Sequence, residues 1–268
     1  MTTDDELLQG LPHRHLTWNT PLSERHADRL LTSLQIAQGA RLVDLGCGGA
    51  ELLLRALASS PQLSGEGVDL DSADLKGARA NAAARGLADR VKFLHGDLIE
   101  YSGTADRVIC IGADHAWGSV EAALSGLRPR VSAGGLLLFG CGYWVRPPSL
   151  QLVETFGNLP PSFEALLLLA RSSEWTVLSA DSADLEEWDE FEAAWRQDLD
   201  DIAAREPSTS LGQRALRLAR QRREEYERGY RGVLGFAYLI LSRTERSGSE
   251  RTTTPGPGER EFTTLGNH

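Results

Sequence analysis

Short runs of strand-forming residues alternate with helical runs between residues 41 and 144, and this alternation limits the possible folds more than any other feature. The predicted strands are 41–46, 66–70, 91–95, 106–111 and 135–140. The runs 50–58 and 72–86 have helical periodicity, and we predict Ser72 as the N-cap and Gly86 as the stop of the second. The alternation is typical of βαβ units, which build a parallel sheet with helices on both faces.

The rest of the chain departs from this alternation. The predicted elements are an amphipathic helix at 21–36 with Ser23 as its N-cap, a helix at 162–173, a strand at 175–181, charged helices at 185–204 and 212–232, and an apolar strand at 233–242. We therefore divide the chain into a lid segment 1–20, a core 21–184, a helical insertion 185–232, a final core strand 233–243 and a tail 244–268. The tail is rich in Ser, Thr, Gly, Pro and Glu, so we expect it to be disordered.

The charge of the chain argues against two classes of partner. With 28 Lys and Arg against 38 Asp and Glu, the 268 residues carry a formal net charge of −10. Nucleic acids and anionic membranes favour basic surfaces, so we expect a small-molecule partner and neither of these two. We recognise no signal peptide or membrane span, and an odd number of cysteines favours a reducing compartment. We therefore predict a cytoplasmic protein in which Cys47, Cys110 and Cys141 are core residues.

The stretch LVDLGCGGAE, residues 42–51, places an acidic residue just ahead of a glycine-rich turn between a strand and a helix. A phosphate is the usual ligand of such a turn, but Asp44 would repel it. A dinucleotide is also disfavoured, because the third glycine of the G-x-G-x-x-G pattern falls on Glu51. The ligand of this turn should therefore carry a positive or hydrogen-donating group.

Two further carboxylates follow the next two predicted strands. Asp69 ends the second strand, where a carboxylate accepts hydrogen bonds from ribose hydroxyls, and Asp97 ends the third, within reach of an adenine amine. Ligands of doubly wound sheets bind at the carboxyl ends of the strands, so the three acids should lie along one crevice. An adenosine with a cationic tail fits this set, and S-adenosylmethionine has that form.

The series Asp44-Leu-Gly46-Cys-Gly48, Gly67-Val-Asp69 and Gly96-Asp97 resembles the class I S-adenosylmethionine-dependent methyltransferases, over residues 20–242. The resemblance implies an α/β fold with a doubly wound, Rossmann-like sheet of seven mostly parallel strands, the last antiparallel. It also implies cofactor contacts from Asp44, Gly46, Cys47, Gly48, Asp69, Leu70, Gly96, Asp97, Leu98 and Gly112. Many members have a third glycine where this chain has Ala50; we expect that alanine in the first helical turn, where it is sterically mild.

Candidate acceptor-site residues follow the fourth and fifth strands. The turn ICIGADHAWG brings Asp114, His115 and Trp117 towards the crevice, and His115 is either a general base or a residue that only hydrogen-bonds backbone in a turn. The stretch CGYWVRPPS resembles the corresponding segment of a subgroup of bacterial small-molecule methyltransferases. Its Tyr143 and Trp144 either contact the substrate, with Tyr143 near the reacting group, or pack against the helix at 162–173.

Three other segments complete the sequence analysis. Trp18 and Asn19 are the predicted contacts of the lid segment, whereas His13 and His15 lack partner ligands, so we expect no metal. The run NLPPSF at 158–163 follows the fifth strand instead of the fourth and so does not match the signature of nucleic-acid amino-methyltransferases. The helical insertion either roofs the substrate pocket or forms a dimer contact, and the protein is a monomer or a homodimer.

The leading functional hypothesis is methyl transfer from S-adenosylmethionine to an N, O or C atom of a small metabolite or natural-product intermediate, releasing S-adenosylhomocysteine. A second hypothesis is an enzyme that cleaves or cyclises the aminocarboxypropyl arm of the same cofactor and releases methylthioadenosine. A third is a cofactor-binding regulator without turnover.

Overall fold

The computed structural model describes residues 16–243 and has one seven-stranded sheet with the strand order β3-β2-β1-β4-β5-β7-β6. The strands are β1 (Arg41–Leu45), β2 (Ser64–Asp69), β3 (Val91–His95), β4 (Ala105–Ile111), β5 (Val131–Trp144), β6 (Trp175–Ser182) and β7 (Leu234–Arg243). Strands β1 to β5 pair in parallel, whereas β7 is antiparallel to both β5 and β6. The prediction of a mostly parallel sheet with an antiparallel last strand is confirmed.

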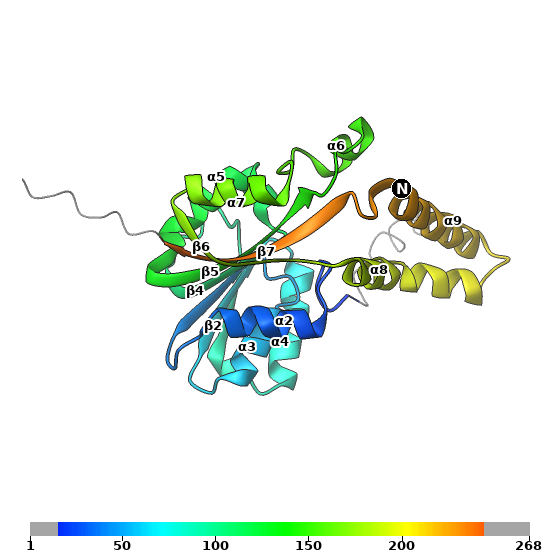
Figure 1. Cartoon of the computed structure of the whole chain (residues 1–268). Helices are drawn as coiled ribbons and strands as arrows, with labels where there is room; N and C mark the ends of the chain where they lie inside the picture. The colour runs from blue at the N-terminus through cyan, green and yellow to red at the C-terminus, as the bar shows by residue number, and fades with distance from the viewer. Residues whose placement is uncertain (1–15, 244–268) are drawn as a thin grey trace, which may run out of the picture.

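Helices cover both faces of this sheet. They are α2 (Glu24–Ser33), α3 (Glu51–Ser59), α4 (Ser72–Ala84), α5 (Val120–Leu127), α6 (Leu150–Phe156), α7 (Phe163–Ser172), α8 (Leu185–Arg205) and α9 (Ser210–Glu224). Figure 1 shows α2, α3 and α4 on one face and α5 and α7 on the other. Residues 16–243 also include four short helical segments, at Ala88–Arg90, Asp114–Trp117, Arg128–Arg130 and, as a π-helix, Glu225–Tyr230.

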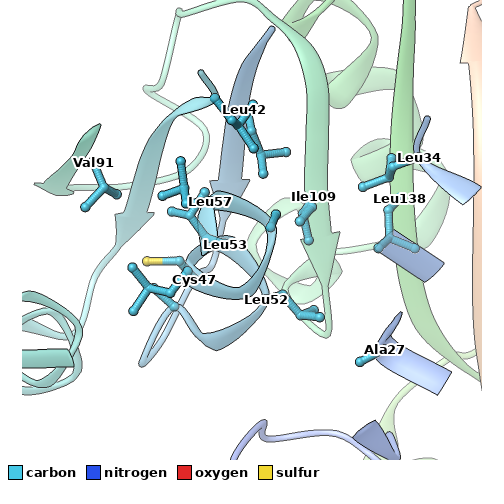
Figure 2. Packing of buried hydrophobic residues seen from close by; sticks show 14 of the residues in the cluster. Ala27, Leu34, Leu42, Cys47, Leu52, Leu53, Leu57, Val91, Ile109 and Leu138 are labelled. Atoms are coloured by element: carbon cyan, nitrogen blue, oxygen red, sulfur yellow. The ribbon is translucent and has the colours of Figure 1, made fainter. Parts of the chain in front are cut away.

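Each face of the sheet has its own apolar core. On the α2–α4 face, leucines of α3 such as Leu53 and Leu57 pack against Leu42 and Ile109 of the central strands, as Figure 2 shows. On the other face, residues of α5 and α7 cover Val108, Leu137 and Leu239. The near-continuous burial of β1 and β7 follows from this coverage on both sides.

Two of the three predicted helix ends match the structure, and one differs. Ser23 accepts a hydrogen bond from the backbone of His26, which makes it the N-cap of α2 as predicted. Gly86 follows α4 with a left-handed φ of 68°, which glycine adopts readily. The N-cap of α4 is Asp71 instead of the predicted Ser72, because the Asp71 carboxylate accepts from the backbone N–H groups of Ala73 and Asp74.

The insertion between β6 and β7 is a helical hairpin that projects from one end of the sheet (Figure 1). An aromatic cluster of Trp144, Trp188, Tyr226 and Tyr230 packs its base against β5 and β7. Further out, Glu192 is fully buried between the two helices and receives two hydrogen bonds from Arg222 and one from Tyr230. These hydrogen bonds join the two helices and satisfy the buried Glu192 carboxylate.

Some segments differ from their predicted bounds in the structure, and others lie outside the residues that it describes. Strand β5 continues to Trp144, beyond its predicted end at residue 140, and α5 and α6 were not among the predicted elements. Residues 1–15 of the lid segment, with His13 and His15, and the tail 244–268 lie outside the described residues. Within residues 16–243, no helix is long and apolar enough to cross a membrane.

Candidate functional site

The turn between β1 and α3 is built around two glycines with left-handed backbone. Gly46 has a φ of 80° and Gly48 a φ of 49°, and the backbone N–H groups of Gly46 and Cys47 both donate to the carbonyl of Val68. A Cβ at Gly46 would lie 2.5 Å from the Cβ of Ala113, so no larger residue fits. The turn is thereby held against the ends of the neighbouring strands, at the point where the strand order reverses between β1 and β4.

Ala50 is the N-cap of α3 and has left-handed backbone, with φ 59° and ψ 27°. The expectation that it lies in the first helical turn is therefore wrong. A left-handed conformation costs a non-glycine residue about 1 kcal/mol, which is a physical reason for glycine at this position in related proteins.

The carboxylate of Asp69 ties the ends of β1 and β2 together. Its two oxygens accept hydrogen bonds from the backbone N–H groups of Gly48, at 2.7 Å, and Asp71, at 2.8 Å. Asp97 lies one strand further along, where it accepts from the N–H of Ile99, and Gly96 donates to the carbonyl of Asp69. The three predicted acids Asp44, Asp69 and Asp97 thus follow three adjacent strands, as expected from the sheet order.

A pocket of about 420 Å³ lies over this turn. Its lining combines the β1–α3 turn, the end of β4, the start of α4 and the lid, and includes Leu16, Thr17, Trp18, Asn19, Thr20, Asp44, Gly46, Cys47, Gly48, Gly49, Ala50, Glu51, Leu52, Asp71, Asp74, Ile109 and Ile111. This volume lies within the range of small-molecule sites. The pocket brings together Asp44, Gly46, Cys47 and Gly48 with the lid residues Trp18 and Asn19.

The sequence analysis missed Asp71 and Asp74 in this pocket. Asp71 is the N-cap of α4 and Asp74 lies in its first turn, and the acidic spacing DLDSAD at 69–74 was the available signal. Of the other predicted cofactor contacts, Leu70 is 59% exposed beside the pocket and Leu98 is 4% exposed in the core. Asp69, Leu70, Gly96, Asp97, Leu98 and Gly112 do not line the 420 Å³ pocket, although Asp69 accepts from the backbone N–H of the lining residue Gly48.

The electrostatics of the pocket are acidic. Burial, followed by the charge of Asp69, raises the pKa of the Asp44 carboxyl from 3.8 to about 7. Among the described residues, no lysine, arginine or histidine lines the pocket. A cationic ligand group beside Asp44 would stabilise its ionised form and lower this pKa again.

The segment after β4 places its polar side chains outside the pocket. His115 is exposed, and its Nδ1 lies 3.1 Å from the carbonyl oxygen of Gly112. Trp117 packs against the core on the α5 and α7 face of the sheet. The guanidinium of Arg130 lies over its ring, 6.0 Å from the ring centre. Burial raises the pKa of Asp114. The backbone contact predicted as one alternative for His115 is the contact that the structure shows.

Tyr143 and Trp144 do not line the pocket either. Tyr143 packs on Phe163 of α7 with ring centres 5.4 Å apart, and its hydroxyl lies 2.9 Å from that of Ser182. Trp144 is 3% exposed in the aromatic cluster at the base of the insertion. Of the two alternatives for these rings, the structure shows packing, with Tyr143 on α7 as predicted for the helix at 162–173, because β5 runs on past residue 140 and carries both rings into the core.

A largely buried polar junction fixes the end of the lid, through the Thr20 hydroxyl 3.1 Å from that of Tyr238, and the start of α2 to the sheet and to the insertion. Glu187, at the start of α8, accepts hydrogen bonds from the backbone N–H and hydroxyl of Ser23, at 2.9 and 2.6 Å, and lies 3.0 Å from Nδ1 of His26. The Nε2 of His26 lies 3.3 Å from Asp181 at the end of β6. Tyr238 of β7 donates to the carbonyl of Pro21. The sequence gives no signal for this junction, since its members are distant in the chain.

The pKa of Glu187 reflects this junction. Burial alone would raise it, but the hydrogen bonds from His26 and Ser23 outweigh burial and lower it to about 2. The carboxylate is therefore ionised throughout the physiological pH range.

Comparison with known proteins agrees with this architecture. Residues 43–137 match the family model of a methyltransferase domain. A methyltransferase from Thiobacillus denitrificans, solved in complex with S-adenosyl-L-homocysteine, superposes with a TM-score of 0.76 at 25% identity, over 91% of this chain and 99% of that one. Residues 43–137 are therefore similar to a methyltransferase domain, and the fold of residues 16–243 is that of the class I S-adenosylmethionine-dependent methyltransferases.

Among individual relatives, the uncharacterized protein YjhP of Escherichia coli is 28% identical over 183 residues, which is 66% of this chain and 73% of that protein. The crystal structure of YjhP superposes with a TM-score of 0.77, covering 88% of this chain and 99% of that one. A methyltransferase from Geobacter sulfurreducens, also in complex with S-adenosyl-L-homocysteine, reaches a TM-score of 0.78 at 24% identity, over 88% and 98% of the two chains. The likeness thus extends beyond the matched domain to the helical insertion.

Proposed function

We propose that the 420 Å³ pocket binds S-adenosylmethionine and that the protein transfers its methyl group to a small molecule. The observation that carries the proposal is the chemistry of the pocket, in which a buried carboxylate, a bare glycine turn and flanking acids meet without a basic side chain among the described residues. This acidic lining favours a neutral adenosine with a cationic amino acid tail and disfavours a phosphorylated nucleotide.

The residues divide the binding of the donor among themselves. Asp44 would hold the ammonium group of the donor, and the backbone of Gly46 and Gly48 would allow close approach of its tail. The carboxylate of Asp69, at the end of β2, would accept hydrogen bonds from the ribose hydroxyls. We further propose that Gly96, Asp97 and Leu98, with Leu70, contact the adenine, and that Gly112 contacts the tail. The donor supplies a methyl group already activated on a sulfonium centre. The protein then needs chiefly to position the acceptor and to exclude water, which the lid and Trp18 do.

A small molecule is the acceptor class that the charge of the chain favours. A net charge of −10 opposes binding of nucleic acid. A cytoplasmic location and a monomeric or dimeric state, with no resident metal, belong to the same proposal. Cleavage of the aminocarboxypropyl arm and binding without turnover are the competing functions.

The experiment combines methyl-deuterated S-adenosylmethionine, purified protein and a small-molecule extract of the source cells, followed by mass spectrometry. The proposal predicts a deuteromethylated metabolite and an equal amount of S-adenosylhomocysteine. Methylthioadenosine above the spontaneous breakdown of the donor would favour the cleavage alternative. Donor binding without either product would favour the regulator.

The ribose assignment has its own test. Replacing Asp69 with Ala removes the carboxylate from the end of β2, and donor affinity should then fall at least about 100-fold, since two hydrogen bonds to a charged group are lost. Isothermal titration with S-adenosylhomocysteine measures the change. Unchanged affinity would refute the assignment.

A further inference from the structure

A second pocket of about 190 Å³ adjoins the first and is lined by the lid, the start of α2 and the first turns of α8. The two pockets share four lid residues as a common wall, namely Leu16, Thr17, Trp18 and Thr20. The far wall of the second pocket comes from the insertion, with Glu187, Glu190, Phe191 and Ala194. A methyltransferase needs one site for the donor and an adjoining site for the acceptor, and the insertion contributes to the second pocket only.

The charges lining the second pocket are all negative. They are Glu24, Glu187 and Glu190, and among the described residues no basic side chain lines this pocket. Glu24 lies 3.7 Å from Arg55, and Glu187 is engaged by Ser23 and His26. Glu190 is therefore the carboxylate best placed to meet a ligand. An anionic molecule such as a carboxylate or a phosphate ester would be repelled from this pocket.

The apolar part of the lining is aromatic. Phe191 is partly buried and meets Trp188 edge to face, with ring centres 6.1 Å apart, which fixes its orientation. Trp18 belongs to the shared wall, its indole N–H donates to the carbonyl of Leu22, and the guanidinium of Arg55 lies over its ring, 5.2 Å from the ring centre. An aromatic face beside a carboxylate is a favourable environment for an organic cation.

Among the described residues, no histidine, lysine or tyrosine lines the second pocket, so a hydroxyl or carbon acceptor would have only carboxylates as general bases. His115, the histidine near the strand ends, lines neither pocket and lies with its Nδ1 3.1 Å from the carbonyl of Gly112. An amine needs no such base, because its own lone pair attacks once its proton has left to water.

We propose that the second pocket is the acceptor site and that it takes a small amine, held by Glu190 and Phe191. This proposal rests on the proposed function, since it assigns the acceptor of the same reaction. The nitrogen lone pair forms the new N–C bond while the methyl C–S bond breaks and its electron pair stays on sulfur. The sulfonium charge thereby passes to nitrogen, and a primary or secondary amine then releases one proton to water.

The test uses three probes with the same ring and different charge, namely benzylamine, benzyl alcohol and benzoate. Each is titrated at pH 7.5 by ligand-detected NMR into the full chain, with and without saturating S-adenosylhomocysteine. The proposal predicts that benzylamine binds at least tenfold more tightly than benzyl alcohol and that benzoate binds more weakly than either. Glu190→Gln should weaken benzylamine about fivefold and leave benzyl alcohol unchanged. Glu186→Gln, an exposed change on the same helix, is the matched control.

Equal binding of the amine and the alcohol, tighter binding of benzoate, no binding of any probe, or an unaltered affinity in Glu190→Gln would each overturn the amine site. Binding of S-adenosylhomocysteine is measured separately on every variant. Loss of the amine preference with intact S-adenosylhomocysteine binding contradicts the acceptor assignment alone. Failure of S-adenosylhomocysteine to bind the wild-type chain contradicts the donor site, whereas the titrations without it still decide the amine preference.

Discussion

At the scale of single residues, the buried carboxylate of Asp44, which the proposed function requires, lowers the stability of the folded chain at neutral pH. The native state keeps the proton of this carboxyl up to a pKa of about 7, whereas the unfolded chain loses it near 3.8. The native state therefore binds more protons, and the free energy of unfolding falls as the pH rises from about 4 to about 7. Above that range the ionised, buried carboxylate costs at most about 4 kcal/mol. A cationic ligand would recover much of this cost.

The Asp44→Asn variant should lack this pH dependence. The unfolding free energy of the variant minus that of the wild type should rise by about 3 kcal/mol between pH 5 and pH 8. Urea denaturation of both proteins without ligand at the two pH values measures the shift. Asp89→Asn, an exposed change, provides the control. A difference that stays constant with pH would contradict the raised pKa.

Substitutions at Gly46 and Gly39 measure the cost of a left-handed backbone separately from the cost of a steric clash. Both have left-handed φ values, 80° and 73°, but only at Gly46 would an added Cβ meet another atom closely. Gly39→Ala should therefore cost about 1 kcal/mol, and Gly46→Ala at least about 2 kcal/mol more. Denaturant unfolding of the two variants compares these costs. Equal destabilisation would mean that the turn can move away from Ala113.

Residues at strand ends were predictable from the sequence, and residues defined by tertiary packing were not. Asp44 and Asp69 follow recognisable strands, so the parallel arrangement alone brings them to one edge. Tyr143 and Trp144 were assigned to the crevice because the end of β5 was placed too early. In an apolar strand buried on both faces, the sequence carries little signal for where pairing stops.

At the scale of elements, the start of α8 links the insertion to the lid through Glu187. Glu187→Gln removes the charge that Ser23 and His26 surround, so we expect a loss of about 2 kcal/mol of unfolding free energy. A loosened lid should also raise the Kd for S-adenosylhomocysteine about fivefold, the equivalent of about 1 kcal/mol. Urea denaturation and isothermal titration measure the two effects.

The exposed variant Glu186→Gln separates this junction from a general effect of charge on α8, and it should change neither quantity. Destabilisation of Glu187→Gln without any change in affinity would show that the junction supports the fold alone. The element pattern itself was largely predicted, because the helical and strand periods of the sequence match the observed elements within a few residues. The junction was not, because it joins residues about 160 positions apart, as the separation of 161 between His26 and Glu187 shows.

At the scale of the whole molecule, burial is unevenly distributed. Two large clusters cover the faces of the sheet, whereas the outer part of the hairpin has a small cluster around Leu199, Ala215 and Ala219. Amide hydrogens in that outer part should exchange faster than those of β1, β4 and β5, because fewer apolar contacts oppose local opening. Hydrogen exchange followed by mass spectrometry tests this order. Equal protection of the hairpin and the central strands would indicate that another surface covers the hairpin.

The central claim is that the acidic pocket holds the cationic tail of S-adenosylmethionine against Asp44, and proton release on binding tests it most directly. The measurement is isothermal titration of the wild-type protein with S-adenosylhomocysteine at pH 6.5, in two buffers with different ionisation enthalpies. Since the free Asp44 carboxyl has a pKa of about 7 and should ionise beside the ligand ammonium, binding should release roughly 0.7 protons. Asp44→Asn should bind weakly and release none. Tight binding by the wild-type protein with no proton release, or unchanged binding by Asp44→Asn, would contradict the claim.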